Sequence, residues 1–218
     1  MAIALKSFIY KSVVTYLCLA LFFDTSLCFA ETIIPQGAWK EWQEHSFNGN
    51  TKYQPGVNGT LKASCENTAS ALYYETEIDL TKTPIMRWAW KVDDVHTALH
   101  ENEKAGDDYP ARIYAIYTPS NAMPWRTKTM NYVWANSQQK NSAWPNAFTN
   151  HAMMLALQSG TTIRKGKWVE ESRNIWEDFK IYFGLDLDRI DGIAIMTDCD
   201  NAGLPMTGYY KNIRFTAE

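Results

Sequence analysis

Oxygen-bearing side chains gather where one apolar run of the chain ends. Residues 193–201, IAIMTDCDN, begin as strand sequence and finish in Asp198, Asp200 and Asn201. Three interpretations are open: a capped turn, a cation site, or the polar floor of a binding cleft. Asp and Asn side chains accept hydrogen bonds from nearby backbone amides, so they cap turns without a metal. Calcium takes about six to eight oxygens; these side chains could supply three, although their spacing lacks the regular pattern of a helix-loop-helix calcium loop.

A second polar cluster, AGDDYPAR, leads into a strand run. Asp107 and Asp108 are adjacent, and adjacent side chains at a strand end point apart, so this pair alone is a poor acid–base dyad. One of them could pair with Arg112 or Lys91 or accept a ligand hydroxyl; a solvated turn with a surface ion pair is the alternative. An enzyme would need two carboxyl groups roughly 5–9.5 Å apart across a cleft. The candidate catalytic carboxylates are Asp107, Asp108, Asp198 and Asp200.

Short runs rich in aromatic and β-branched residues must position these side chains. They occur at residues 60–64, 70–80, 85–92, 111–118, 130–135, 151–159, 191–197 and 208–215, with turn-forming segments between them. Their fairly even spacing predicts a mainly all-β protein, an antiparallel β-sandwich or jelly roll. In EESRNIWEDFKIYFG, Ile175, Phe179 and Phe183 recur at helical spacing before Gly184, which predicts one amphipathic helix near 172–183.

Alternation along the strands predicts which side chains share a face. In RWAWKV the tryptophans point away from Lys91, and in ARIYAIY the set with Ile113 points away from Arg112 and Tyr114. If these strands are neighbours of the one that carries Asp198, one carboxylate meets two cations and forms a rigid polar floor. The candidate ligand-binding residues are Lys91, Asp108, Arg112, Tyr114, Asn131, Trp134, Asp198 and Asn201. The candidate metal ligands are Asp198, Asp200 and Asn201.

Composition argues against several classes of function. The chain has 21 Lys and Arg against 24 Asp and Glu, a formal net charge of −3, whereas a nucleic-acid-binding protein normally shows a basic footprint. There is no G-x-S-x-G and no phosphate-binding glycine loop, and HTALH lacks the adjacent Glu of a zinc-protease helix. Nine tryptophans indicate stacking surfaces or a very aromatic core. No cofactor is expected, apart from a structural calcium ion at the candidate metal ligands.

The N-terminus has the layout of a secretory signal peptide. A basic start is followed by the apolar core SVVTYLCLALFF and by Ala30 at the cleavage position, and this core is short for a membrane span. An uncleaved anchor is the alternative. We therefore expect a signal peptide at 1–30 and a single β-sandwich domain at 31–218. The mature protein would be periplasmic or extracellular, without a membrane span.

Two cysteines, Cys65 and Cys199, would remain after cleavage. An exported pair favours a disulfide, and two isolated buried thiols are the alternative. Sequence alone does not bring their Cα atoms within bonding range.

Several segments together resemble a known family. WAWKV, KAGDDYPARIYAIY, MNYVWA, ESRNIWEDFKIYFG, IDGIAIMTDCDNAG and GYYKNIRF occur in the order found in a family of exported bacterial proteins, domain of unknown function 3047. The resemblance spans roughly residues 37 to 217 and implies no particular activity. The family usually has Thr at the position of Cys199, so a Cys65–Cys199 disulfide would be particular to this chain. A looser resemblance to galactose-binding-like jelly rolls implies the architecture of many carbohydrate-binding modules.

Three functions remain open at this point. The aromatic content and the mixed Asp, Asn, Arg and Tyr clusters favour a noncatalytic module that binds a glycan or a small polar ligand. A structural or partner-binding envelope protein is the first alternative. A glycan-active hydrolase or lyase with paired carboxylates is the second.

Export generates the first testable prediction. N-terminal sequencing of the secreted protein should begin at Glu31, because Ala30 ends the predicted signal peptide. A mature protein that still starts within residues 1–20 would contradict it.

Overall fold

Most of the described chain forms two β-sheets. The computed structural model describes residues 30–34, 39–120, 123, 126–160 and 166–218. Its strands are β1 (Glu31–Ile33), β2 (Gln43–Asn48), β3 (Lys52–Pro55), β4 (Leu61–Cys65), β5 (Ala69–Asp79), β6 (Ile85–Val92), β7 (Tyr109–Tyr117), β8 (Lys128–Ala135), β9 (Ala143–Pro145), β10 (Ala152–Ser159), β11 (Val169–Asn174), β12 (Arg189–Asp198) and β13 (Met206–Thr216). Its helices are α1 (Ile175–Phe183) and the short 3-10 turns η1 (Trp39–Glu41), η2 (Val57–Gly59) and η3 (Lys104–Gly106).

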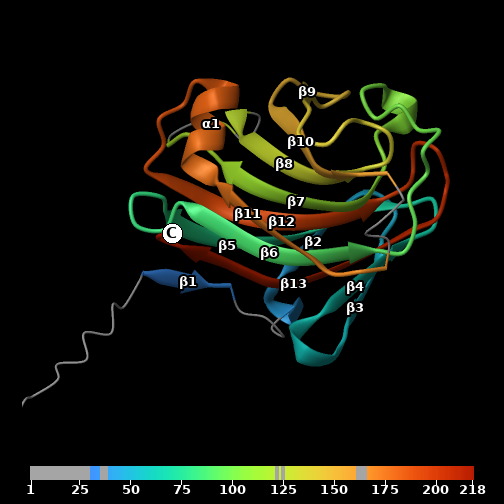
Figure 1. Cartoon of the computed structure of the whole chain (residues 1–218), viewed down its shortest axis with the longest axis horizontal. Coiled ribbons are helices and arrows are strands. Elements are labelled where there is room, and N and C mark those ends of the chain that lie inside the picture. The colour runs from blue at the N-terminus through green and yellow to red at the C-terminus, as the bar shows by residue number, and fades with distance from the viewer. Residues whose placement is uncertain (1–29, 35–38, 121–122, 124–125, 161–165) are drawn as a thin grey trace, which may run out of the picture.

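The strands are sorted into two stacked layers (Figure 1). The six-stranded sheet has the order β11-β6-β13-β4-β3, with β1 paired to β13, and the seven-stranded sheet has the order β2-β5-β12-β7-β8-β10-β9. From β4 to β7 the chain passes from one sheet to the other at each strand, and β11, β12 and β13 alternate in the same way. This is a β-sandwich of the jelly-roll type, which confirms the predicted fold class.

Each predicted strand run falls in a strand, and one strand pair departs from the antiparallel arrangement of the others. β8 and β10 run parallel, with Asn131 opposite Met154. The chain returns through the segment after β8 and through β9, so that β10 starts beside the start of β8, where the Thr129 amide donates to the His151 carbonyl over 3.0 Å. Strands β1, β2, β3, β9 and β11 were not predicted. β2 shows why, because all six of its side chains are exposed and no alternation marks it.

The aromatic strand residues fill the space between the sheets. Trp88 and Trp90 of β6 are 1% and 0% exposed. The Trp88 ring lies 5.5 Å from that of Tyr132 on β8, and the Trp90 ring lies 6.0 Å from that of Trp134, also on β8. Strand alternation therefore sends one face of β7, β8 and β12 into this core and leaves the opposite face for polar side chains.

The predicted helix is present, but it starts later than expected. Ser172 belongs to β11, where it pairs with Arg87 of β6. The helix α1 begins at Ile175 because the side chain of Asn174 accepts a hydrogen bond from the Glu177 amide, and it ends at Gly184 in the left-handed conformation. It lies at one end of the sandwich (Figure 1).

Two predictions concern membranes and export. No helix in the described part of the chain combines the length and the apolar character that crossing a bilayer requires. The predicted signal peptide at 1–30 lies outside the described residues, apart from Ala30.

A glycine lets the two sheets approach each other beneath the outer polar face. A Cβ atom added to Gly208 of β13 would lie 2.2 Å from the carbonyl oxygen of Pro110 and 2.8 Å from Oγ1 of Thr197. Thr197 Oγ1 in turn donates to that carbonyl over 2.9 Å. Pro110 and Thr197 belong to β7 and β12, the strands that also carry Arg112 and Asp198.

We expect Gly208→Ala to lower the free energy of unfolding by about 1–3 kcal/mol or more, because the clash is with backbone. Urea denaturation of the purified protein measures this. Gly56→Ala is the matched control, since its added Cβ would meet nothing closer than 3.5 Å. Equal stability of the two variants would contradict the close approach of the sheets.

Candidate functional site

The outer face of the seven-stranded sheet carries a cavity of about 430 Å³. Its floor comes from neighbouring strands at the centre of the sheet: Met196 and Asp198 from β12, Arg112 and Tyr114 from β7, and Asn131 from β8. These side chains leave their strands on the face opposite the aromatic core, as strand alternation requires.

Exposed aromatic side chains border this floor. Phe47, on edge strand β2, is 63% exposed, and Phe148, in the loop between β9 and β10, is 56% exposed. Both phenylalanines line the cavity, and so do Asn146 and Thr149 from the loop between β9 and β10. Because β2 and β9 form opposite edges of the sheet, the cavity runs across the strands from one edge towards the other.

A buried ion pair holds the centre of the floor. Arg112 Nη2 lies 2.9 Å from Asp198 Oδ2, and the two side chains are 7% and 3% exposed. The second guanidinium nitrogen, Nη1, donates to the Tyr114 hydroxyl over 3.1 Å, and the Tyr109 ring lies 4.3 Å from the guanidinium carbon. Burial alone would lower the pKa of Arg112, but Asp198, Tyr114, Asp107 and Tyr109 together oppose it and hold that pKa above its usual range.

Three buried polar atoms at this floor have no hydrogen-bond partner among the described residues. They are Arg112 Nε, Asn131 Oδ1 and Asp198 Oδ1. Their residues are 5%, 1% and 2% exposed. An unsatisfied buried polar group costs roughly 1–3 kcal/mol, so a floor with one donor and two acceptors left open is matched to an occupant that supplies the missing partners.

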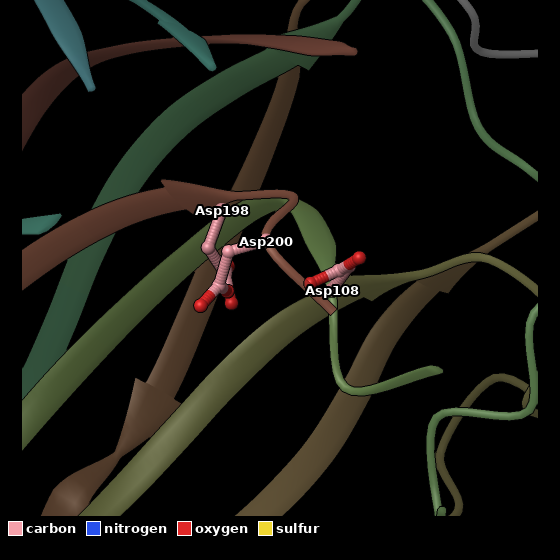
Figure 2. Close-up of side chains that lie close together, drawn as sticks. All are labelled: Asp108, Asp198 and Asp200. Carbon is pink, nitrogen blue, oxygen red and sulfur yellow. The ribbon is translucent and has the colours of Figure 1, made fainter. Parts of the chain in front are cut away.

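Asp108 organises the loop after β12 instead of lining the cavity. Its Oδ1 accepts from the Asn201 amide over 3.0 Å and its Oδ2 from the Ala202 amide over 2.7 Å. The turn is thus capped by Asp108, the residue just before β7, whereas capping by the turn's own Asp200 and Asn201 was one of the open interpretations. Figure 2 shows Asp198 at the end of β12, Asp200 in the following loop, and Asp108 on the other side of that loop. One oxygen from each of the three carboxylates lies within 4.8 Å of the others, so this group could hold a metal ion.

Asp107 is a buried carboxyl group that lines the cavity. It is 5% exposed and accepts from the Tyr109 hydroxyl over 3.0 Å and from Asn146 Nδ2 over 2.8 Å. Burial raises its pKa and the charge of Asp108 adds to the increase, while Arg112 and the two hydrogen bonds oppose it. Burial likewise raises the pKa of Asp198, against the opposing charge of Arg112.

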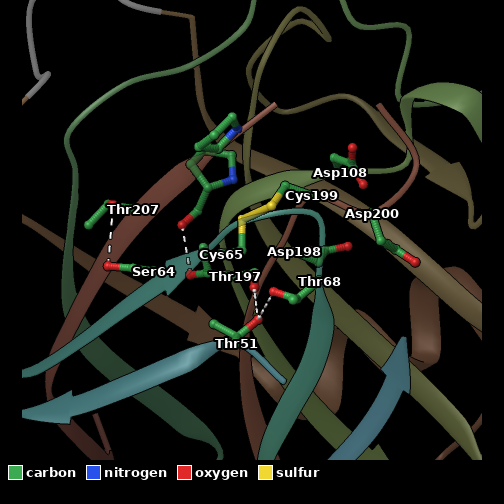
Figure 3. The surroundings of a disulfide bond; sticks show 12 residues. Thr51, Ser64, Cys65, Thr68, Asp108, Thr197, Asp198, Cys199, Asp200 and Thr207 are labelled. Carbon is green, nitrogen blue, oxygen red and sulfur yellow. Dashed lines mark hydrogen bonds between the residues drawn. A yellow bond between two sulfur atoms is a disulfide. The ribbon is translucent and has the colours of Figure 1, made fainter. Parts of the chain in front are cut away.

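A disulfide ties the cavity loop to the other sheet. Cys65, at the end of β4, is bonded to Cys199, and their Cα atoms are 6.0 Å apart. Figure 3 shows the bond beside Asp198 and Asp200, the neighbours of Cys199 in the chain. Closing a loop of 134 residues would stabilise the fold by about 5 kcal/mol in the chain-entropy model.

Three of the predicted ligand-binding residues do not line the cavity: Asp108, which holds the loop after β12, and Lys91 and Trp134. The expectation that Lys91 lies beside Arg112 is wrong, because β6 and β7 belong to different sheets. Lys91 Nζ instead lies 3.9 Å from the centre of the Tyr209 ring and 5.6 Å from that of Trp168. Trp134 packs in the core rather than at the cavity. The predicted residues that do line the cavity are Arg112, Tyr114, Asn131, Asp198 and Asn201, together with Asp107 and Asp200 from the catalytic and metal candidates.

Sequence reasoning missed the aromatic border. Phe47 stands in HSFNGN and Phe148 in NAFTN, each a single aromatic residue within a polar, turn-forming segment. An aromatic residue in such a segment has no regular core position to occupy, and that was the available signal. The opposite edges that bring both to one cavity follow only from the strand order.

Fold and site together define a β-sandwich with a polar, aromatic-bordered cavity on one sheet. The chain belongs to the family described as protein of unknown function (DUF3047), whose model matches residues 40–214. Among functionally curated proteins, none matches this sequence.

Solved structures with similar architecture include carbohydrate-binding modules. A family 29 carbohydrate-binding module has 11% sequence identity and a TM-score of 0.40, with 87% of this chain and 89% of that chain covered. A family 29 module from Piromyces equi has 8% identity and a TM-score of 0.37, with 88% and 93% covered.

The raised pKa of Asp107 predicts a pH dependence of stability. A carboxyl group with a higher pKa in the folded state than in the unfolded state binds its proton more tightly when folded, so its contribution to stability falls as pH rises above the ordinary value of 3.8. Asp107→Asn removes this titration. We therefore expect its melting temperature, relative to wild type, to rise by about 2 °C or more between pH 4 and pH 7. The exposed Asp186→Asn controls for general charge effects, and a difference that does not change with pH would contradict the prediction.

Proposed function

We propose that the cavity binds a carbohydrate chain and does not transform it. The observation that carries this proposal is the set of open atoms on the floor, namely Arg112 Nε, Asn131 Oδ1 and Asp198 Oδ1. A sugar hydroxyl donates one hydrogen bond and accepts others, so neighbouring hydroxyls satisfy a donor and two acceptors together. A simple anion would leave the two acceptors open, and a simple cation would leave the donor open.

The aromatic border of the cavity favours a ligand that contains rings with apolar faces. Phe47 and Phe148 keep more than half of their surface exposed although they are large and apolar. The C–H faces of a sugar ring can cover such rings while its hydroxyls reach the polar floor. Contacts of both kinds, apolar with the rings and polar with the floor, explain why polar and aromatic residues line the same cavity.

The extent of the cavity favours an oligosaccharide over a single sugar. The lining extends from Phe47 on β2 to Ala152 on β10. Five strand-to-strand intervals of about 4.8 Å separate these strands, a span of roughly 24 Å. Export guided by residues 1–30 would bring such a module to glycans of the cell envelope or its surroundings.

A hydrolase or lyase is the second candidate, favoured by the raised pKa of Asp107. A carboxyl group whose pKa lies above its usual range is better suited to act as a general acid than an ordinary one. Analysis of the saccharides for cleavage products after incubation therefore belongs in the same experiment.

The binding proposal is tested with a panel of neutral hexose and N-acetylhexosamine oligosaccharides, by calorimetry and thermal shift. For whichever member binds, we expect Asn131→Ala to weaken affinity about tenfold, because a hydrogen-bond acceptor is lost from a buried floor. Phe148→Ala should weaken it about two- to tenfold through lost ring contact. Ile181→Ala removes a similarly exposed apolar side chain from α1, outside the cavity, and should leave the saccharide affinity unchanged.

Two results would overturn the proposal. One is the absence of binding across the panel by wild-type protein. The other is an affinity that Asn131→Ala and Phe148→Ala leave equal to that of the Ile181→Ala control. Release of shorter saccharides would replace binding by catalysis as the function.

A further inference from the structure

Negative charge is in excess around the ion pair. Asp107, Asp198 and Asp200 line the cavity, and Arg112 is the only cation among the described residues that line it. Asp108 adds a further carboxylate close to Asp198 and Asp200. One guanidinium therefore cannot neutralise the group, and an additional positive charge would be stabilised there.

The oxygens of three of these carboxylates have free coordination capacity. Asp198 Oδ1 has no partner among the described residues, and its residue is 2% exposed. Asp108 Oδ2 accepts one hydrogen bond, from the Ala202 amide. Asp200 makes two contacts of 3.3 Å, with the amide groups of Asn48 and Asn201. Since a carboxylate oxygen accepts two bonds, each residue can still ligate an ion.

We propose that Asp108, Asp198 and Asp200 bind a calcium ion at the edge of the cavity floor. Calcium takes oxygen ligands at roughly 2.3–2.6 Å in flexible geometry, whereas Mg²⁺ demands a near-ideal octahedron at about 2.0–2.1 Å. One oxygen from each of the three carboxylates lies within 4.8 Å of the others, a separation that ligands of one calcium ion can have. Three protein ligands leave other calcium positions open, and Asp198 and Asp200 face the cavity, where water or ligand hydroxyls would complete the shell.

The protein holds these ligands in place before the ion arrives. Cys199 stands between Asp198 and Asp200 and is bonded to Cys65 on the other sheet. Asp108 is fixed by the amides of Asn201 and Ala202. Little conformational entropy remains to be lost on binding, which favours affinity.

The test uses the mature protein, freed of metal with a chelator and titrated with CaCl₂ alone, by calorimetry and thermal melting. Because no saccharide is present, the result is independent of the proposed glycan binding. We expect one ion per chain with Kd on the order of 10⁻⁴ M. The melting temperature should rise by about 3–6 °C at ~1 mM Ca²⁺, with a smaller rise for MgCl₂.

Asp200→Asn is the informative variant, because Asp200 is only partly buried and no ion pair is lost. It should melt close to wild type without calcium and bind calcium at least tenfold more weakly. Asp93→Asn removes the same charge beside Tyr209 of the other sheet and should bind as wild type does. Absence of both heat and melting shift in wild-type protein overturns the proposal, and so does an Asp200→Asn variant with unchanged affinity.

Discussion

The buried ion pair between Arg112 and Asp198 is the interaction on which the polar side of the protein depends. Both groups are removed from water at the centre of a sheet, where desolvation costs each ion several kcal/mol. Such a pair adds little net stability, but loss of one partner costs about 3–5 kcal/mol because the other remains charged and buried. The pair therefore constrains its neighbourhood: Tyr109, Tyr114 and Asp107 are arranged around it.

The same strands make the core and the site, so the two are coupled. Tyr132 of β8 packs against Trp88 between the sheets, and its neighbour Asn131 faces the cavity. Ile113 of β7 is fully buried while Arg112 pairs with Asp198 on the opposite face. A shift of one residue in strand register would exchange these faces, which is why packing of the aromatic core also fixes the positions of the polar groups.

The loop after β12 is held by three independent contacts. Asp108 accepts from its amides, the Cys65–Cys199 disulfide ties it to the six-stranded sheet, and the Cys199 amide donates to the Thr68 carbonyl over 3.0 Å. Loops usually carry function at the expense of order. Here Asp200 and Asn201 gain positions nearly as defined as those of strand residues, which suits a site with a preformed geometry.

Local sequence patterns determined the strand runs, their faces and the C-terminal end of the single described α-helix. Alternation in ARIYAIY was enough to turn Arg112 away from the core, and Gly184 marked the end of the helix, although its start was expected near residue 172. These features depend on neighbours within a few residues, and the sequence displays those neighbours directly. The resemblance in ordered motifs indicated the family to which the chain belongs.

Only the tertiary structure decided which strands are neighbours. Lys91 and Arg112 have the same local pattern, yet β6 and β7 lie in different sheets, so one cation pairs with Asp198 and the other rests on Tyr209. The joining of Phe47 and Phe148 at one cavity is likewise a consequence of strand order. Strand order reflects the packing of the whole chain, a balance of contacts between residues far apart, and no local period in the sequence encodes it.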